Sequence, residues 1–149
     1  MPAKMSCPYF FPVEPRAGGS DPQSAMLPLG DLWTGMCHAV PGQALPPEEA
    51  LIRPLCHLGY ARGNCKRFPA DDPGADAVRL TISSDDGRSL HLYYVLERDH
   101  HPFAHGPLEY STAAGRLVQA SVTETVGRQA EAYAASYLRR KERAASPVL

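Results

Sequence analysis

Apolar and polar residues alternate over residues 76–96 with the two-residue period of half-buried strands. Val78, Leu80 and Ile82 fall on one face of the first of these strands. The sequence Asp-Asp-Gly-Arg at 85–88 interrupts the alternation and is typical of a hairpin turn. Shorter runs at 108–111 and 116–119 predict two further strands. The pattern therefore predicts a small antiparallel meander of three or four strands over residues 76–119.

A helical period follows the predicted sheet. Ser121 and Glu124 have the spacing of a capping box, which predicts a helix over residues 121–143. Its apolar residues form one stripe that we expect to pack on the sheet; they are Val122, Val126, Ala130, Tyr133, Ala134, Tyr137 and Leu138. The basic run at 139–143 is expected to be a solvated helix end, where cations face the negative pole of the helix dipole.

Residues 1–73 show neither period and contain 12 of the 15 prolines. Because proline lacks an N–H and constrains the preceding residue, we expect turns and extended coil here, without a long helix or a central strand. One short helix is predicted, beginning at Pro47, kinked by Pro54 and ended by Gly59. The predicted fold is α+β: an irregular proline-rich N-terminal half around a metal site, followed by the meander and a C-terminal helix packed on it.

Composition fits one globular domain over residues 1–149, with 44% hydrophobic and 21% charged residues. The net charge of −1 divides into +1 for residues 1–70, −5 for 71–127 and +3 for 128–149. No broad basic surface is predicted, so nucleic acid is not an expected partner. No apolar run approaches the roughly 18 residues of a membrane span, and the N-terminal apolar stretch is too short for a secretory signal. We therefore expect a cytoplasmic protein without a membrane partner.

All four cysteines, Cys7, Cys37, Cys56 and Cys65, lie in the proline-rich half. In a reducing compartment, metal binding or redox chemistry is a better explanation for such a set than disulfides. This half has few periodic apolar residues with which to build a core, and a metal centre would order it because ligation energy adds to folding energy. The alternatives are four buried thiols that act as small hydrophobic residues, or disulfides.

The spacing of the cysteines bears on the identity of the metal. Structural zinc sites usually use pairs of the form C-x₂₋₄-C, and the chain has none. Iron–sulfur clusters accept ligands from separate segments, and a cysteine followed by proline, as at Cys7, recurs in ferredoxins. We therefore expect one cluster, of the 4Fe–4S type, on the four cysteines, with zinc as the alternative. Arg62, Lys66 and Arg67 are expected to offset thiolate charge.

Four histidines are possible secondary ligands. His38 and His57 each follow a cysteine and could replace one thiolate or donate a hydrogen bond to a cluster sulfur. His101 and His105 lie in a predicted coil over residues 97–105, where imidazoles and carboxylates could form a second metal site or a general base. The alternative interpretation of this coil is a loop with solvated or structural histidines.

Several segments together resemble a known set of proteins. They are residues 7–10 (Cys-Pro-Tyr-Phe), residues 55–61 with Cys65 and residues 67–69, and residues 94–100. These segments resemble an uncharacterised bacterial family of small four-cysteine proteins with no assigned activity. The resemblance covers most of the chain and implies that the cysteines act as a set.

These observations predict a small iron–sulfur protein that acts in electron transfer or redox sensing with a protein redox partner. No G-x-S-x-G sequence, glycine-rich phosphate loop or other signature of catalysis is present. The first alternative is a zinc-stabilised structural or interaction module. The second alternative is an enzyme that uses the histidine-rich segment 97–105.

Overall fold

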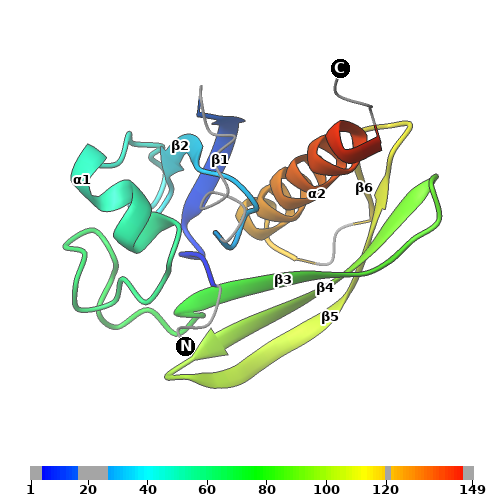
Figure 1. Ribbon diagram of the computed structural model, residues 1–149. Helices are drawn as coiled ribbons and strands as arrows, with labels where there is room; N and C mark the ends of the chain where they lie inside the picture. The colour runs from blue at the N-terminus through cyan, green and yellow to red at the C-terminus, as the bar shows by residue number, and fades with distance from the viewer. Residues whose placement is uncertain (1–4, 17–26, 120–121, 146–149) are drawn as a thin grey trace.

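The computed structural model describes residues 5–16, 27–119 and 122–145 (Figure 1). The elements in chain order are β1 (Phe10–Pro15), β2 (Trp33–Cys37), α1 (Glu49–Leu51), a π-helical turn (Ile52–Cys56), β3 (Ala77–Asp85), β4 (Ser89–Arg98), β5 (His101–Ser111), β6 (Arg116–Gln119) and α2 (Glu124–Ala145). The strands form a two-stranded and a four-stranded sheet, both antiparallel. Antiparallel sheets followed by a C-terminal helix make the α+β class that the sequence predicts.

The four-stranded sheet is the predicted meander, with strand order β3-β4-β5-β6. Val78 and Leu80 are buried on its inner face, whereas Arg79 and Thr81 are exposed on the outer face. The predicted β3–β4 turn is also present, and the carboxylate of Asp86 accepts hydrogen bonds from backbone N–H groups that follow it at 2.8 and 2.9 Å. Alternation and turn chemistry were therefore sufficient to predict the β3–β4 hairpin of this sheet.

The prediction of a coil over residues 97–105 is wrong. β4 continues to Arg98 and β5 begins at His101, so only Asp99 and His100 form the turn. Both have positive φ, 52° and 63°, which a tight two-residue hairpin turn requires. The N–H of Asp99 donates to the carboxylate of Asp76 at 2.8 Å, and this tertiary bond helps to hold a turn that contains no glycine.

Helix α2 begins later than predicted, at Glu124. The hydroxyl of Thr123 accepts a hydrogen bond from the N–H of Val126 at 3.2 Å, so Thr123 is the N-cap residue. Ser121, the cap residue predicted from the sequence, lies outside the described residues. Val126, Ala130 and Ala134 of the stripe are buried, and its other residues are partly buried. Helix α2 contacts β1 of the small sheet as well as β3 and β6 of the large one (Figure 1). Within the described ranges, no helix is long and apolar enough to span a bilayer.

The basic end of α2 is not simply solvated, as the sequence suggested. Arg139 and Arg140 both form ion pairs with the buried Asp31, the latter at 2.9 Å. Lys141 forms an ion pair with Asp85 at the end of β3, at 2.7 Å. These pairs connect the helix to both halves of the chain.

The N-terminal half is more regular than predicted, because β1 and β2 form a two-stranded sheet. Strand β1 contains Pro12 and Pro15. Proline is tolerated there because each strand of a two-stranded sheet has one free edge, where a missing N–H removes no hydrogen bond between the strands. The register shifts between Pro12 and Glu14, as at a β-bulge.

The short helix predicted from Pro47 is present as α1 and the π-helical turn that follows it. Pro54 has no N–H to donate, and around it the hydrogen bonding changes to a wider spacing, with the N–H of His57 donating to the carbonyl of Ile52 at 2.9 Å. Gly59 follows with a φ of 73°, as expected of a residue that ends a helix.

Candidate metal centre

The four cysteines, all free thiols, line one cavity. Cys7 precedes β1, Cys37 ends β2, Cys56 ends the π-helical turn, and Cys65 lies in the loop that follows. Cys7 is buried, and the other three are half-buried. Segments that are distant in the sequence thus bring all four predicted ligands to the same place.

The cavity is small and mainly apolar. Its volume is about 30 Å³. Its other lining residues are Tyr9, Phe10, Ala39, Pro47, Glu48, Leu51, Leu55, Ala61, Lys66, Arg67 and Phe68. Apolar walls exclude water from the sulfurs, which is a property of buried metal centres.

Backbone hydrogen bonds join the cysteine segments to one another. The N–H of Cys7 donates to the carbonyl of Cys56 at 3.1 Å, and the N–H of His38 donates to the carbonyl of Tyr9 at 2.9 Å. The N–H of Cys65 donates to the carbonyl of Ala61 at 2.7 Å, which closes a turn around that thiol. The cavity is therefore built by main-chain pairing as well as by side-chain packing.

Gln129 supports the Cys7 segment from α2. Its amide nitrogen donates to the carbonyls of Cys7 and Phe10, both at 2.7 Å, and its carbonyl oxygen accepts from the hydroxyl of Ser6 at 2.6 Å. Gln129 and Ser6 have no exposed surface. We did not predict this role, but a polar residue on the apolar stripe three positions after Val126 is a signal that could have revealed it.

His57 is placed where it cannot serve as a ligand, contrary to its suggested secondary role. One ring nitrogen accepts a hydrogen bond from the N–H of Trp33 at 2.8 Å, and the other donates to the carbonyl of Ile52 at 3.0 Å. Burial lowers the pKa of this fully buried imidazole to about 4. His57 is thus a neutral bridge between β2 and the π-helical turn, the two elements that end in Cys37 and Cys56.

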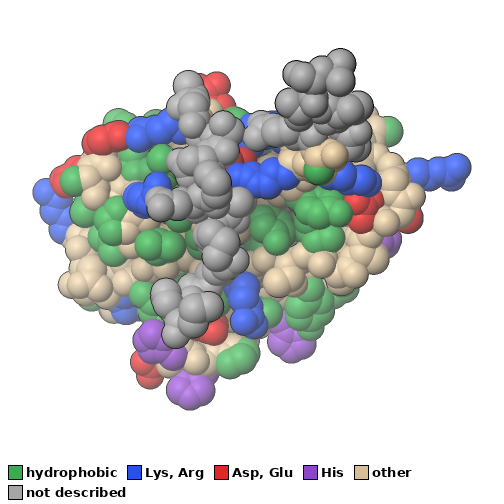
Figure 2. All heavy atoms as spheres, viewed as in Figure 1, with side chains coloured by type: hydrophobic (Ala, Val, Ile, Leu, Met, Phe, Trp, Pro, Cys, Tyr) green, Lys and Arg blue, Asp and Glu red, His purple; other side chains and the backbone are tan. Residues whose placement is uncertain are grey.

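The other three suggested histidines also lie away from the cysteine cavity. His38 stacks on Phe11 with ring centroids 4.8 Å apart. The exposed His101 and His105 lie on β5, where one contacts the carbonyl of Asp99 and the other the hydroxyl of Tyr93. Figure 2 shows histidine side chains at the lower edge of the molecule, where β4 and β5 lie in Figure 1. None of the three lines the cysteine cavity.

Burial raises the pKa of Cys7 and of Cys56 to about 12. The neighbouring cysteines contribute to the raised pKa of both thiols. A hydrogen bond from the N–H of Tyr9 acts in the opposite direction on Cys7, as does the charge of Arg67 on Cys56. Both thiols are therefore protonated at neutral pH without a metal, and a metal must displace their protons.

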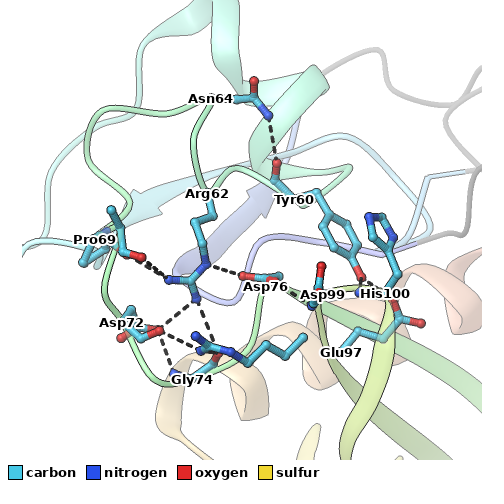
Figure 3. A network of polar contacts seen from close by, with 12 residues as sticks. Tyr60, Arg62, Asn64, Pro69, Asp72, Gly74, Asp76, Glu97, Asp99 and His100 are labelled. Carbon is cyan, nitrogen blue, oxygen red and sulfur yellow. Dashed lines mark hydrogen bonds and ion pairs between the residues drawn. The ribbon is translucent and has the colours of Figure 1, made fainter.

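The predicted cations separate into two groups. Arg62 does not line the cavity, and its guanidinium lies over the Phe68 ring. Its Nε donates to Asp76 at 2.6 Å, and its Nη1 donates to the carbonyl of Ala70 at 2.9 Å (Figure 3). Its role is to close the loop that carries Cys65, so the prediction of a charge beside the thiolates is wrong for this residue. Lys66 and Arg67 do line the cavity.

In the described part of the chain, no group of three or more His, Cys, Asp or Glu side chains is arranged to hold a single metal ion. The four thiols share a cavity without closing around one point. No protein-family model, curated protein or solved structure matches the chain. The resemblance to the four-cysteine family therefore stays a prediction, and the candidate centre rests on its residues and their geometry.

Proposed function

We propose that the protein binds an iron–sulfur cluster through Cys7, Cys37, Cys56 and Cys65. The observation that carries the proposal is that the only four cysteines of the chain, from four separate segments, line the same apolar cavity. Thiols that served only as small hydrophobic residues would have no reason to gather at one place. Thiolate ligands are the type that iron–sulfur clusters require.

The arrangement of the thiols favours a cluster over a single ion. In a 4Fe–4S cluster each cysteine binds a different iron atom, so the sulfurs surround a larger body than one zinc ion. Four ligands from separate segments, without a C-x₂₋₄-C pair, suit such a centre. Cys37, Cys56 and Cys65 are half-buried, so a cluster on them would reach the surface of the protein.

Zinc is the second candidate, because four thiolates are also a common ligand set of structural zinc. In the described residues the thiols would have to move closer together to bind one ion. A zinc site would make the protein a metal-stabilised structural or interaction module, since four thiolates leave no open position for chemistry. The enzymatic alternative on residues 97–105 gains no support from His101 and His105, because both are exposed and hydrogen-bond only to Asp99 and Tyr93 within the hairpin.

A bound cluster would supply one-electron chemistry, and we propose electron transfer or redox sensing with a protein partner. Three of the four thiols are half-buried, so the centre would lie near the surface. A redox centre close to the surface can exchange electrons with a docked protein. The chain's own residues would hold the cluster and exclude water from it.

Visible absorption of the anaerobically reconstituted protein tests the proposal. The wild-type protein and Met36→Leu should be brown, with broad visible absorption, while Cys37→Ser should lose this absorption. Met36 is a matched control because it precedes Cys37 on β2 and does not line the cavity. A colourless wild-type protein that contains zinc would support the second candidate, and full absorption in Cys37→Ser would exclude Cys37 as a ligand.

A further inference from the structure

Arg67 carries a positive charge on the wall of the cysteine cavity. Its side chain is half-buried, and its Nη1 donates a hydrogen bond to the carbonyl of Pro46 at 2.9 Å. The next residue, Pro47, lines the cavity too. This hydrogen bond helps to fix the guanidinium at the cavity and does not neutralise its charge.

Lys66 also lines the cavity, but its charge is compensated. Its ammonium lies 3.4 Å from the carboxylate of Glu48, and its side chain is 82% exposed. Among the residues that the structure describes, no carboxylate lies within ion-pair distance of Arg67. Two adjacent cations therefore differ in solvent screening and in pairing, and Arg67 is the one left without an anion.

We propose that Arg67 is the fixed counter-charge of the metal centre and raises its reduction potential. The proposal rests on the proposed cluster, whose four thiolates would provide the anion that Arg67 lacks. When the cluster takes up one electron, it gains one negative charge, and no covalent bond to the protein has to form or break. A nearby fixed cation stabilises the more negative, reduced state, and its effect is greater in a site with apolar walls than in water.

A redox titration of the reconstituted protein tests this role, with dithionite as the electron donor and iron and sulfide measured in every sample. Arg67→Gln should keep the cluster and shift the reduction potential to a more negative value. Lys66→Gln should shift it much less, because that charge is exposed and already paired. Arg67→Lys should restore most of the wild-type potential, since it keeps a charge at this position.

An unchanged potential in Arg67→Gln, or an equal shift in Lys66→Gln, would overturn the role of Arg67 while leaving the cluster itself in place. If Arg67→Gln cannot hold a cluster, Arg67→Lys becomes the test of the counter-charge. A cluster-loaded Arg67→Lys protein with nearly the wild-type reduction potential supports this role, and failure of both variants to bind a cluster overturns it. A wild-type protein without iron and sulfide would refute the proposed function itself, and the role of Arg67 would fall with it.

Discussion

His57 and Gln129 are polar side chains without exposed surface, and each connects segments that carry cysteines. His57 bridges β2 and the π-helical turn, while Gln129 binds the main chain around Cys7. Buried polar groups of this kind stabilise a fold only when every hydrogen bond is made, because an unmade one costs the full desolvation energy. They are therefore the positions at which single substitutions should affect the cysteine cavity without removing a thiol.

Stability should decrease in acid through His57. The pKa of His57 is about 4 in the folded protein and about 6.5 in the unfolded chain, so between these values the unfolded state binds more protons. Its contribution is complete above pH 6.5, and as the pH falls to 4 the free energy of unfolding should drop by about 3 kcal/mol. Urea unfolding at several pH values measures this.

The variant His57→Gln is the comparison for that measurement. It should be less stable at neutral pH but should lose less stability between pH 6.5 and 4. Loss of metal in acid affects both proteins alike, so the difference between the two pH profiles isolates His57. Parallel profiles would show that His57 is not buried in its neutral form.

Replacing Gln129 should destabilise the protein in proportion to the hydrogen bonds lost. Gln129→Leu leaves two carbonyls and the Ser6 hydroxyl without this partner, at a cost of about 3 kcal/mol. Ser6→Ala removes one of the three bonds and should cost about 1 kcal/mol. Urea unfolding of both variants checks the ratio, and equal effects would contradict the described network.

At the level of elements, the pairing of β1 with β2 requires a glycine. A Cβ on Gly35 would lie 2.3 Å from the carbonyl oxygen of Phe11 and 2.9 Å from the Phe10 ring. The backbone oxygen cannot move without breaking the strand pair. Gly35→Ala should therefore destabilise the protein by about 2 kcal/mol and weaken metal binding, because β2 ends in Cys37.

Gly127→Ala is the matched control for this prediction. The added Cβ on α2 would meet Leu117 and Val122 at 3.7 and 3.8 Å, which are ordinary contacts. Alanine also favours the helix by about 1 kcal/mol, so stability should be unchanged or higher. Thermal unfolding of the two variants compares them, and a Gly35→Ala protein as stable as wild type would refute the described strand pair.

The elements differ in how well the sequence predicts them. The β3–β4 hairpin and α2 follow from clear periods of two and 3.6 residues. The β1–β2 pair was missed because its prolines argue against a strand, and only the tertiary pairing shows that each strand keeps a free edge. The β4–β5 turn was missed because Asp99 and His100 adopt positive φ with the help of Asp76, a contact that no local pattern reveals.

The candidate site could also be predicted only in part. The number of cysteines and their position in the proline-rich half were enough to predict that the four act together. That the four cysteines and Arg67 line one cavity, while Arg62 binds Asp76 instead, depends on side-chain directions in irregular loops. The spacing of residues along the sequence does not determine these directions.

At the scale of the molecule, one cluster of buried side chains includes residues of both halves, such as Phe10 and Phe68 with Leu80 and Leu92. The distribution of regular structure is nevertheless uneven, since long strands and α2 lie after residue 76. The N-terminal half has short elements joined by loops, and the four thiols lie within it. We therefore expect a metal centre to stabilise this half more than the other.

Removal of the metal should affect the two halves differently. Amide hydrogen exchange of the loaded protein and of the protein stripped with a chelator measures this. Residues 27–73 should exchange much faster after stripping, whereas β3, β4 and α2 should change little. Equal changes throughout the chain, or none, would contradict a metal centre confined to the N-terminal half.

The most direct test of the central claim is the iron and acid-labile sulfide content of the wild-type protein purified without oxygen. A 4Fe–4S protein should contain both in equal amounts, about four of each per chain, and Cys37→Ser should lose them. Zinc in place of iron, or no bound metal, would contradict the central claim.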